Sequence, residues 1–203
     1  MGAVKRPNPQ PEGWSYTREY PDFAGSVDSL VVLGQHQMPS ALLGLPKTQA
    51  ALAYATRVHD GQRRKADGAP FIAHPREVVS LLYHAGAPDH VIAAGALHDT
   101  IEKTDTDASE LRKRFGIRVA RLVVAVSEDE RISSYTQRKM ALRDQAADAG
   151  EEALMVLAAD KISKARELRL KPGVAQRSRR RRLTNYRGCL HLLQVRLPDS
   201  PTE

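Results

Sequence analysis

The sequence predicts an all-α protein, and hydrophobic periodicity is the first observation behind this prediction. From Lys47 onward, apolar residues recur at intervals of three and four, as in Val78, Val79, Leu81 and Leu82. This period is typical of one face of an α-helix. Sustained alternation of apolar and polar residues, which would indicate strands, is missing from the sequence.

Helix boundary signals are the second observation. Pro75 suits the first turn of a helix, and Gly86 suits a helix end. Asp107 followed by Glu110 forms a capping box at a helix start, and Gly116 follows the end of that helix. We expect about eight to ten helices. The predicted segments lie near 47–62, 75–85, 88–102, 107–115, 117–127, 134–148, 151–170 and 174–195.

Length and composition are the third observation. The 203 residues include 31 Lys and Arg and 24 Asp and Glu, which gives a formal net charge of +7. A domain of this length buries roughly 70% of the surface that its unfolded chain exposes, so its core needs no disulfide or structural metal. The single cysteine, Cys189, excludes intramolecular disulfides and cysteine-based zinc sites. These features indicate one globular domain, a reducing and cytoplasmic location, and an anionic partner.

Proline content divides the chain near Pro46. Six of the twelve prolines lie in the first 46 residues, where no apolar period holds for more than a turn. We expect 1–46 to be a loosely structured N-terminal extension, 47–196 to be the folded domain and 197–203 to be a C-terminal tail. The first twenty residues contain no apolar run that could form the core of a signal peptide. No apolar stretch approaches the ~20 residues needed to cross a bilayer, so no membrane partner is expected.

His98 and Asp99 are candidate functional residues because they follow the apolar stretch 93–97. Burying a histidine and an aspartate at the end of an apolar helix is costly unless something pairs with them, and a metal ion would do so. For an isolated pair of this kind, a core histidine beside a helix-capping aspartate is the alternative interpretation.

Two further donors extend this pair. His74 precedes Pro75, and a proline holds the preceding backbone extended, so we expect this imidazole to point away from the helix that follows. Asp160 lies within the apolar run 157–161. Two imidazoles and two carboxylates form a mixed nitrogen and oxygen set, which suits Mn, Fe, Co or Zn better than Ca or Mg. The spacings between the four residues are too long to be diagnostic by themselves, so the four are candidate ligands of a catalytic metal site.

Five motifs follow one another along the predicted domain. They are HDGQRRK at 59–65, GAPFIAHP at 68–75, ALHDTIE at 96–102, FG at 115–116 and ADK at 159–161. In this combination and order they resemble the HD-domain hydrolases of (p)ppGpp, which comprise the hydrolase domain of RelA/SpoT-type proteins and small stand-alone relatives. The resemblance covers about residues 47–196.

The resemblance implies an HD-domain helical fold around one metal site. In that fold His74, His98, Asp99 and Asp160 would bind one divalent ion, usually manganese (Mn²⁺). The reaction would remove pyrophosphate from the 3′ position of a guanosine nucleotide. The implied partner is therefore a phosphorylated nucleotide, either guanosine or another purine.

Four other positions match the family's motifs. Glu102 matches the acidic residue beyond the HD pair and could orient a water or move its proton; a solvated helix-end carboxylate is the alternative. Arg64 and Lys65 match the basic pair that forms a wall of the nucleotide pocket, and a solvated basic loop is the alternative. His59 matches a position that is not a metal ligand, so we interpret it as a structural or pocket-rim histidine.

Two departures from the family's pattern put the substrate in doubt. Lys103 stands where family members usually carry an acid after Glu102, and Lys164 stands where they typically carry Asn. We assign Lys103 to the catalytic set, because a cation there could attract phosphate or protonate a leaving oxygen. We assign Lys164 to substrate binding. The substrate is therefore expected to be shifted to another phosphorylated nucleotide.

Two other classes of function stay open. A nucleotide-binding regulator that keeps the metal but has lost turnover would explain both lysines. A polyanion-binding or RNA-binding protein would explain the run of arginines at 177–182. Only Tyr186 lies close to that run, so there is no aromatic platform for single strands, and we do not expect RNA binding. The sequence does not predict an oligomeric state.

Overall fold

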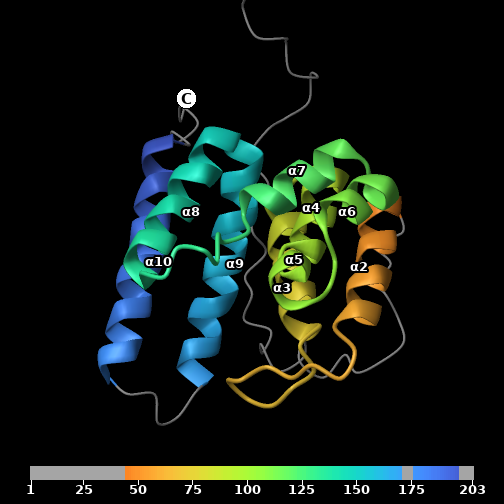
Figure 1. Cartoon of the computed structure of the whole chain (residues 1–203). Helices are drawn as coiled ribbons and strands as arrows, with labels where there is room; N and C mark the ends of the chain where they lie inside the picture. The colour runs from red at the N-terminus through yellow and green to blue at the C-terminus, as the bar shows by residue number, and fades with distance from the viewer. Residues whose placement is uncertain (1–43, 171–175, 197–203) are drawn as a thin grey trace, which may run out of the picture. The chain divides into compact units, whose positions relative to one another are not determined.

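Nine α-helices form the regular structure of residues 44–170 and 176–196, the part of the chain that the computed structural model describes (Figure 1). They are α2 (Pro46–Val58), α3 (Ala73–His84), α4 (Asp89–Leu97), α5 (Thr100–Lys103), α6 (Ala108–Phe115), α7 (Ile117–Ala125), α8 (Tyr135–Ala149), α9 (Glu151–Leu170) and α10 (Gln176–Arg196). Within these residues, β-type pairing is limited to one antiparallel bridge between Arg63 and Pro70. The all-α prediction is confirmed. The predicted tail, and residues 1–43 of the predicted extension, lie outside the described residues.

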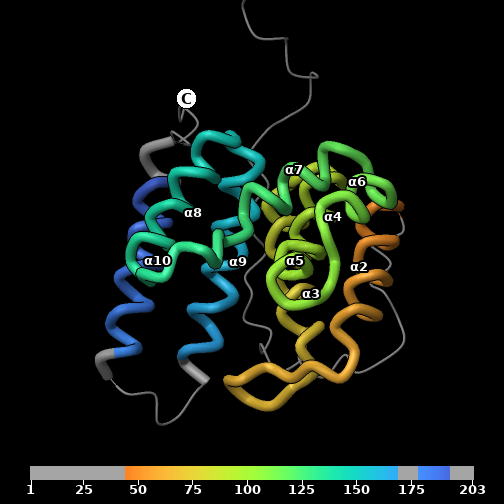
Figure 2. The backbone as a smooth tube through the Cα atoms, in the orientation of Figure 1, coloured from red at the N-terminus to blue at the C-terminus, as the bar shows by residue number. Residues whose placement is uncertain are grey.

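α4 is the central helix of the core. Every residue from Val91 to Leu97 is buried, and none of them carries a polar side chain. α2, α3, α7 and α9 pack around this helix (Figure 2). A helix that is apolar on all sides is stable only when it is covered on all sides. This packing places the end of α4, and the His98-Asp99 pair that follows it, inside the protein.

Gly95 allows α3 to approach α4 closely. A Cβ atom at this position would overlap the side chain of Leu82 and come within 3.2 Å of Cγ1 of Val78, and both residues belong to α3. Glycine is therefore the residue that fits without displacing α3. One turn further along the two helices, His98 meets His74.

The helix predicted over 88–102 is divided in the structure. α4 ends at Leu97, and the chain turns at His98 and Asp99 before α5 begins. Asp99 has φ −94° and ψ −2°, which departs from regular helical geometry. The prediction of one continuous helix is therefore wrong at the candidate site itself.

The prediction of an extended backbone at His74 is also wrong. α3 begins at Ala73, so His74 is its second residue and Pro75 its third. The first N–H groups of a helix have no partner within it, so a proline costs no hydrogen bond there. His74 is thus held by the first turn of α3 and not by an extended segment before it.

The capping signals predicted for the middle of the chain are confirmed. Asp107 Oδ1 accepts a hydrogen bond of 2.7 Å from the backbone N–H of Glu110 at the start of α6. Gly116, with φ +88°, separates α6 from α7 and adopts a backbone conformation that favours glycine. Gly86, with φ +72°, follows the end of α3 in the same way.

α9 lies between two groups of helices. It packs against α3 and α4 and also against α8 and α10, and Figure 1 shows it in this position. It can therefore carry a side chain into the core beside α3 and α4. α9 has 20 residues and α10 has 21, yet within the described residues no helix is both long and apolar enough to cross a membrane.

Candidate metal centre

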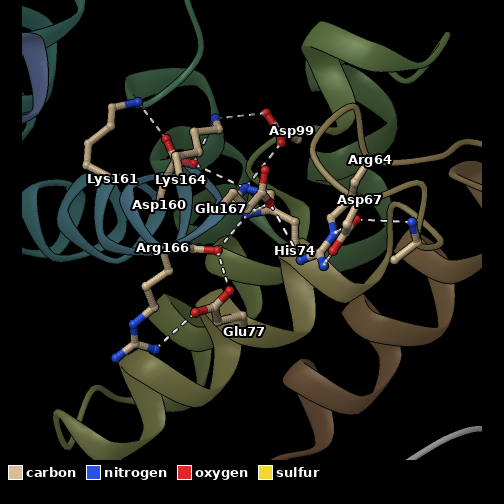
Figure 3. Close-up of polar contacts among 12 residues, drawn as sticks. Arg64, Asp67, His74, Glu77, Asp99, Asp160, Lys161, Lys164, Arg166 and Glu167 are labelled. Atoms are coloured by element: carbon tan, nitrogen blue, oxygen red, sulfur yellow. Dashed lines mark hydrogen bonds and ion pairs between the residues drawn. The ribbon is translucent and has the colours of Figure 1, made fainter. Parts of the chain in front are cut away.

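Four buried side chains from three parts of the fold meet in the core. His74 comes from the first turn of α3, His98 and Asp99 from the turn between α4 and α5, and Asp160 from the middle of α9. None of the four exposes more than 4% of its surface. In Figure 3 the side chains of His74, Asp99 and Asp160 point toward one another.

The contacts among these side chains are short. The Nε2 atoms of His74 and His98 lie 3.0 Å apart. Asp99 Oδ2 lies 3.5 Å from His74 Nε2 and 3.3 Å from His98 Nε2. Asp160 Oδ1 lies 3.1 Å and 3.4 Å from the same two nitrogens. The structure therefore brings the four predicted ligands together: potential ligand atoms of His74, His98 and Asp99 all lie within 4.8 Å of one another, and Asp160 contacts both imidazoles.

Hydrogen bonds on the outer nitrogens determine which way each imidazole presents its lone pair. His98 Nδ1 lies 2.8 Å from the carbonyl oxygen of Gly95, so Nδ1 carries the proton. His74 Nδ1 lies 2.9 Å from Ser163 Oγ, which donates its own proton to Glu77 Oε2 at 2.8 Å. Ser163 therefore accepts the hydrogen bond from His74. In both neutral imidazoles the Nε2 lone pair is directed at the centre of the cluster.

The inner atoms of the cluster are all hydrogen-bond acceptors, so they need positive charge beside them. Among the described residues, no hydrogen bond of good geometry reaches Asp99 Oδ2 or Asp160 Oδ1. Two lone pairs and two carboxylate oxygens that face one another in a buried site repel each other strongly. A positive ion bound between them removes this repulsion. The donor set of two nitrogens and two oxygens therefore fits a divalent transition metal ion.

A proton is the competitor for this position. Burial opposes the charged form of His98, but the carboxylates of Asp99 and Asp160 outweigh burial and raise the pKa of His98 to about 9. Burial lowers the pKa of His74. The metal-free cluster therefore favours the protonated form of His98, and a metal ion held by the neutral imidazole would take the place of that proton.

Three lysines surround the two carboxylates. Lys161 Nζ lies 2.5 Å from Asp160 Oδ2. Lys164 Nζ lies 2.7 Å from Asp160 Oδ1 and 3.8 Å from Asp99 Oδ1. Lys103 Nζ lies 3.4 Å from Asp99 Oδ1. Two of these lysines were predicted site residues, and Lys161 was not.

These cations change the ionisation of the site. Burial alone would raise the pKa of each aspartate. Lys164 and His98 nevertheless hold the pKa of Asp99 well below its usual range, and Lys161 and Lys164 do the same for Asp160. Burial opposes the charge of Lys164, but the two carboxylates raise its pKa. Both carboxylates and Lys164 are therefore ionised at neutral pH.

Glu102 and Lys103 lie beside the cluster on α5. Glu102 Oε1 accepts a hydrogen bond of 2.7 Å from the backbone N–H of Glu128, and burial raises the pKa of Glu102. Lys103 exposes 34% of its side chain, and its Nζ lies 5.6 Å from the centre of the Phe71 ring. The structure thus holds Glu102 in a fixed position and leaves Lys103 accessible to a ligand.

Of the two predicted residues in the basic loop before α3, only Arg64 contacts the network around the cluster. Arg64 pairs with Asp67 of the same loop, and its Nη1 lies 3.7 Å from Glu167 Oε1 on α9. Glu167 Oε1 also lies 3.5 Å from His74 Nδ1, so Arg64 is linked to the cluster through this carboxylate. Lys65 is exposed and makes no hydrogen bond or ion pair with any described residue.

His59 is buried at the start of this loop, with 3% of its surface exposed. Its Nδ1 lies 2.9 Å from Gln62 Oε1, and Gln62 Nε2 donates to the carbonyl oxygen of Lys103 at 2.8 Å. His59 thus connects the loop to α5, and its contacts fit a structural histidine.

Sequence reasoning did not find the residues that support the ligands. Ser163 and Glu167 follow Asp160 by three and seven positions, and Glu77 follows His74 by three. Residues at these spacings share one face of a helix. Helical periodicity counted from each proposed ligand would have indicated all three.

The arginine run at the start of α10 is separate from this network. Arg179, Arg180 and Arg181 are exposed, and the guanidinium of Arg181 lies 4.1 Å from the centre of the Tyr135 ring. The side chain of Arg177 lies outside the described residues. Polyanion binding by this run stays an alternative that the structure does not test.

An all-helical fold around a buried set of two histidines and two aspartates defines a class of metal-dependent hydrolases. The chain belongs to the HD-domain family, because the model of this family, described as HD domain, matches residues 51–185. The predicted family, fold class and hydrolase class are confirmed.

Several proteins of known activity resemble this chain. It is 39% identical over 121 residues to guanosine-3′,5′-bis(diphosphate) 3′-pyrophosphohydrolase MESH1 of Homo sapiens, which covers 58% of this chain and 67% of that protein. It is 32% identical over 156 residues to a GTP pyrophosphokinase of Streptomyces coelicolor, covering 73% of this chain and 18% of that protein. A solved structure of a metazoan ortholog of SpoT, which hydrolyzes ppGpp, matches with a TM-score of 0.67 and 28% identity over 79% of this chain and 90% of that chain.

Proposed function

We propose that the protein is a metal-dependent nucleotide pyrophosphohydrolase. Its reaction would remove pyrophosphate from the 3′ position of (p)ppGpp or of another phosphorylated purine nucleotide. The observation that carries the proposal is the meeting of His74, His98, Asp99 and Asp160, in which one oxygen of each aspartate lies within 3.5 Å of both imidazole Nε2 atoms. The similarity to pyrophosphohydrolases supports the reaction type.

The four side chains would hold one divalent ion, for which we propose Mn²⁺. When bound, such an ion supplies a water of lowered pKa and a positive charge for the phosphoryl oxygens. The hydrogen bonds from His74 to Ser163 and from His98 to Gly95 would keep both imidazoles in the ligating tautomer.

Glu102 would be the proton-transfer group. Its carboxylate is held by Glu128, and its raised pKa brings it closer to the range in which a carboxyl group exchanges protons near neutral pH. Lys103 would act beside it as a cation for the phosphoryl oxygens or for the leaving oxygen.

The charged rim of the site suits a substrate with several phosphates. Lys103 and Lys164 stand beside the carboxylates, and Arg64 reaches α9 from the loop. Cations in these places would neutralise a pyrophosphate group, and Lys65 could add to them from the surface of the loop. We propose that these residues bind the nucleotide and that the protein works in the cytoplasm.

The nucleotide (p)ppGpp is one candidate substrate, and a panel of nucleotides tests it against others. The full chain is assayed with Mn²⁺ against ppGpp, pppGpp and 5′-phosphorylated purine nucleotides, with phosphate and pyrophosphate measured separately. We expect pyrophosphate release from at least one nucleotide, and faster release from a nucleotide other than ppGpp. Lys103→Asp should shift the preference toward ppGpp. Equal ppGpp turnover by the parent protein and Lys103→Asp would contradict the proposed substrate shift.

A regulator that binds a nucleotide without hydrolysing it is the second candidate. The observation in its favour is the crowding of Lys161, Lys164 and Lys103 around the two carboxylates. Nucleotide binding by both the parent protein and Lys103→Asp, with no turnover by either in Mn²⁺, would replace the enzyme proposal with this one.

A further inference from the structure

Lys164 contacts the oxygen atom that faces the two histidines. Its Nζ lies 2.7 Å from Asp160 Oδ1, and the same oxygen lies 3.1 Å from His74 Nε2 and 3.4 Å from His98 Nε2. Lys164 Nζ also approaches Asp99, at 3.8 Å from Oδ1. Its ammonium is thus directed into the cluster between the two carboxylates (Figure 3).

The other two lysines contact atoms on the outside of the cluster. Lys161 binds Asp160 through Oδ2, and Lys103 approaches Asp99 through Oδ1, whereas the oxygens near the histidines are Asp160 Oδ1 and Asp99 Oδ2. Lys161 and Lys103 can therefore keep their contacts when the inner oxygens bind an ion. Lys164 cannot keep its contact in the same way.

An ammonium group and a divalent ion on the same carboxylate oxygen repel each other. At a few ångströms this repulsion is large even at a surface-like effective dielectric, and the site is more buried than that. The ammonium of Lys164 can move away from the cluster, because 28% of the Lys164 side chain is exposed, whereas only 5% of the Lys161 side chain is exposed. Its flexible four-carbon stem allows the ammonium to move to solvent or to an anionic ligand.

We infer that Lys164 is an internal counter-ion that competes with the divalent metal for Asp160 Oδ1. The inference rests on the metal site of the proposed function. It implies that the affinity of this site for the metal depends on the position of Lys164. With the lysine in contact, the carboxylates are neutralised without metal. With the lysine displaced, the same atoms are free to ligate, so the protein binds metal more weakly than its four donors alone would allow.

The test is a calorimetric titration of Mn²⁺ into the full chain after removal of metal by a chelator. Lys164→Asn and Lys164→Gln remove the charge, and the second variant keeps more of the stem for packing if the first is poorly folded. We expect both to bind Mn²⁺ at least about tenfold more tightly than the parent protein. Lys103→Asn is the matched control, because it removes one positive charge from the outer oxygen of Asp99, and we expect a change of less than about threefold.

A second readout separates competition from a general effect of charge. In chelator, the Lys164 variants should unfold at a lower temperature than the parent protein, because the two buried carboxylates lose one of their positive neighbours. Added Mn²⁺ should raise the unfolding temperature of these variants by a larger amount than that of the parent. Equal Mn²⁺ affinity in all proteins, or an equal gain in Lys103→Asn, would overturn the inference and leave the metal site standing. Failure of every protein to bind Mn²⁺ would overturn both.

Discussion

α4 and α9 each deliver an aspartate to the same buried point, but their surroundings differ. α4 brings Asp99 at the end of a run in which every residue from Val91 to Leu97 is apolar and buried. α9 brings Asp160 within a face that also carries Lys161, Ser163 and Lys164. One carboxylate is positioned by packing, and the other is positioned among charges and hydrogen bonds.

This difference predicts that substitutions around the two helices affect different properties, namely the stability of the fold and the affinity of the site for metal. Changes near α4 should act on stability, because that helix is held by close contact with its neighbours. Changes on α9 should act on metal affinity and charge, since its polar side chains contact the ligands directly. Substitutions on each side can therefore test the comparison, beginning with the largest expected effect.

The largest effect is expected at Asp99, because α4 positions this residue and its carboxylate is also a proposed metal ligand. Asp99→Ala removes one of four donors and leaves the two imidazoles in the core with one carboxylate, so most of the bound metal should be lost. Elemental analysis of protein purified without chelator measures this loss. Asp129→Ala is the control, because Asp129 pairs with the exposed Arg131. Stoichiometric metal in the Asp99→Ala, Asp160→Ala double variant would contradict the metal site itself.

Ser163→Ala on α9 should have the next largest effect, which we expect on metal affinity. The substitution removes the acceptor for His74 Nδ1, so the ligating tautomer of His74 is less well held. We expect Mn²⁺ affinity to fall about 10- to 100-fold, the usual cost of losing such a partner. Thr184→Ala on α10 removes an exposed hydroxyl and should leave affinity unchanged. An unchanged affinity in Ser163→Ala would show that Glu167 alone orients His74.

Gly95→Ala tests the α4 side. The added methyl group would overlap Leu82, so α3 must shift, and we expect the free energy of unfolding to fall by about 1–3 kcal/mol. In Gly188→Ala the new Cβ would meet Arg143 side-chain atoms at 3.5 Å, an ordinary contact, and we expect a gain of roughly 0.5–1 kcal/mol. Urea denaturation measures both. Equal effects at the two glycines would remove the evidence for close approach of α3 and α4.

The smallest effect is expected from Glu128, which fixes Glu102 through its backbone. Burial opposes ionisation of Glu128, but Lys139 and Arg138 outweigh burial and lower the pKa of Glu128 from its ordinary value. The stability that follows is present above the ordinary pKa and is lost as the pH falls through the lowered native pKa. Glu128→Gln should therefore destabilise the protein at neutral pH, and its difference from the parent should close in acid.

Urea midpoints of the parent, Glu128→Gln and Gly95→Ala between about pH 3 and pH 7 measure this dependence. The difference caused by Gly95→Ala should stay constant, since it arises from packing. A pH-independent effect of Glu128→Gln would show that its ion pairs add nothing to stability.

The sequence was sufficient to find the four side chains of the cluster. His74, His98, Asp99 and Asp160 are recognisable because each is a polar residue set in an apolar run or beside a proline, and because the motifs around them occur in one order. Neither property depends on where a helix starts or stops. The site could therefore be predicted although two helix boundaries next to it were wrong.

The details that depend on tertiary contact could not be predicted in this way. Residues 88–102 have a local pattern that suits one helix, and the turn at His98 and Asp99 leaves no signal in that pattern. The contact of Lys164 with Asp160 Oδ1 is likewise a matter of side-chain geometry. From sequence, a lysine four residues after an aspartate is an ordinary helix pair.

Competition between Lys164 and the metal for Asp160 Oδ1 would make metal binding depend on anionic ligands that bind Lys164. A phosphate group that draws Lys164 away strengthens the binding of the metal, and thermodynamic reciprocity requires the bound metal to strengthen phosphate binding by the same factor. The binding of the two ligands would then be positively coupled through Lys164. If Lys164 competes with the metal as proposed, the site would fill at a lower free Mn²⁺ concentration when the nucleotide is present.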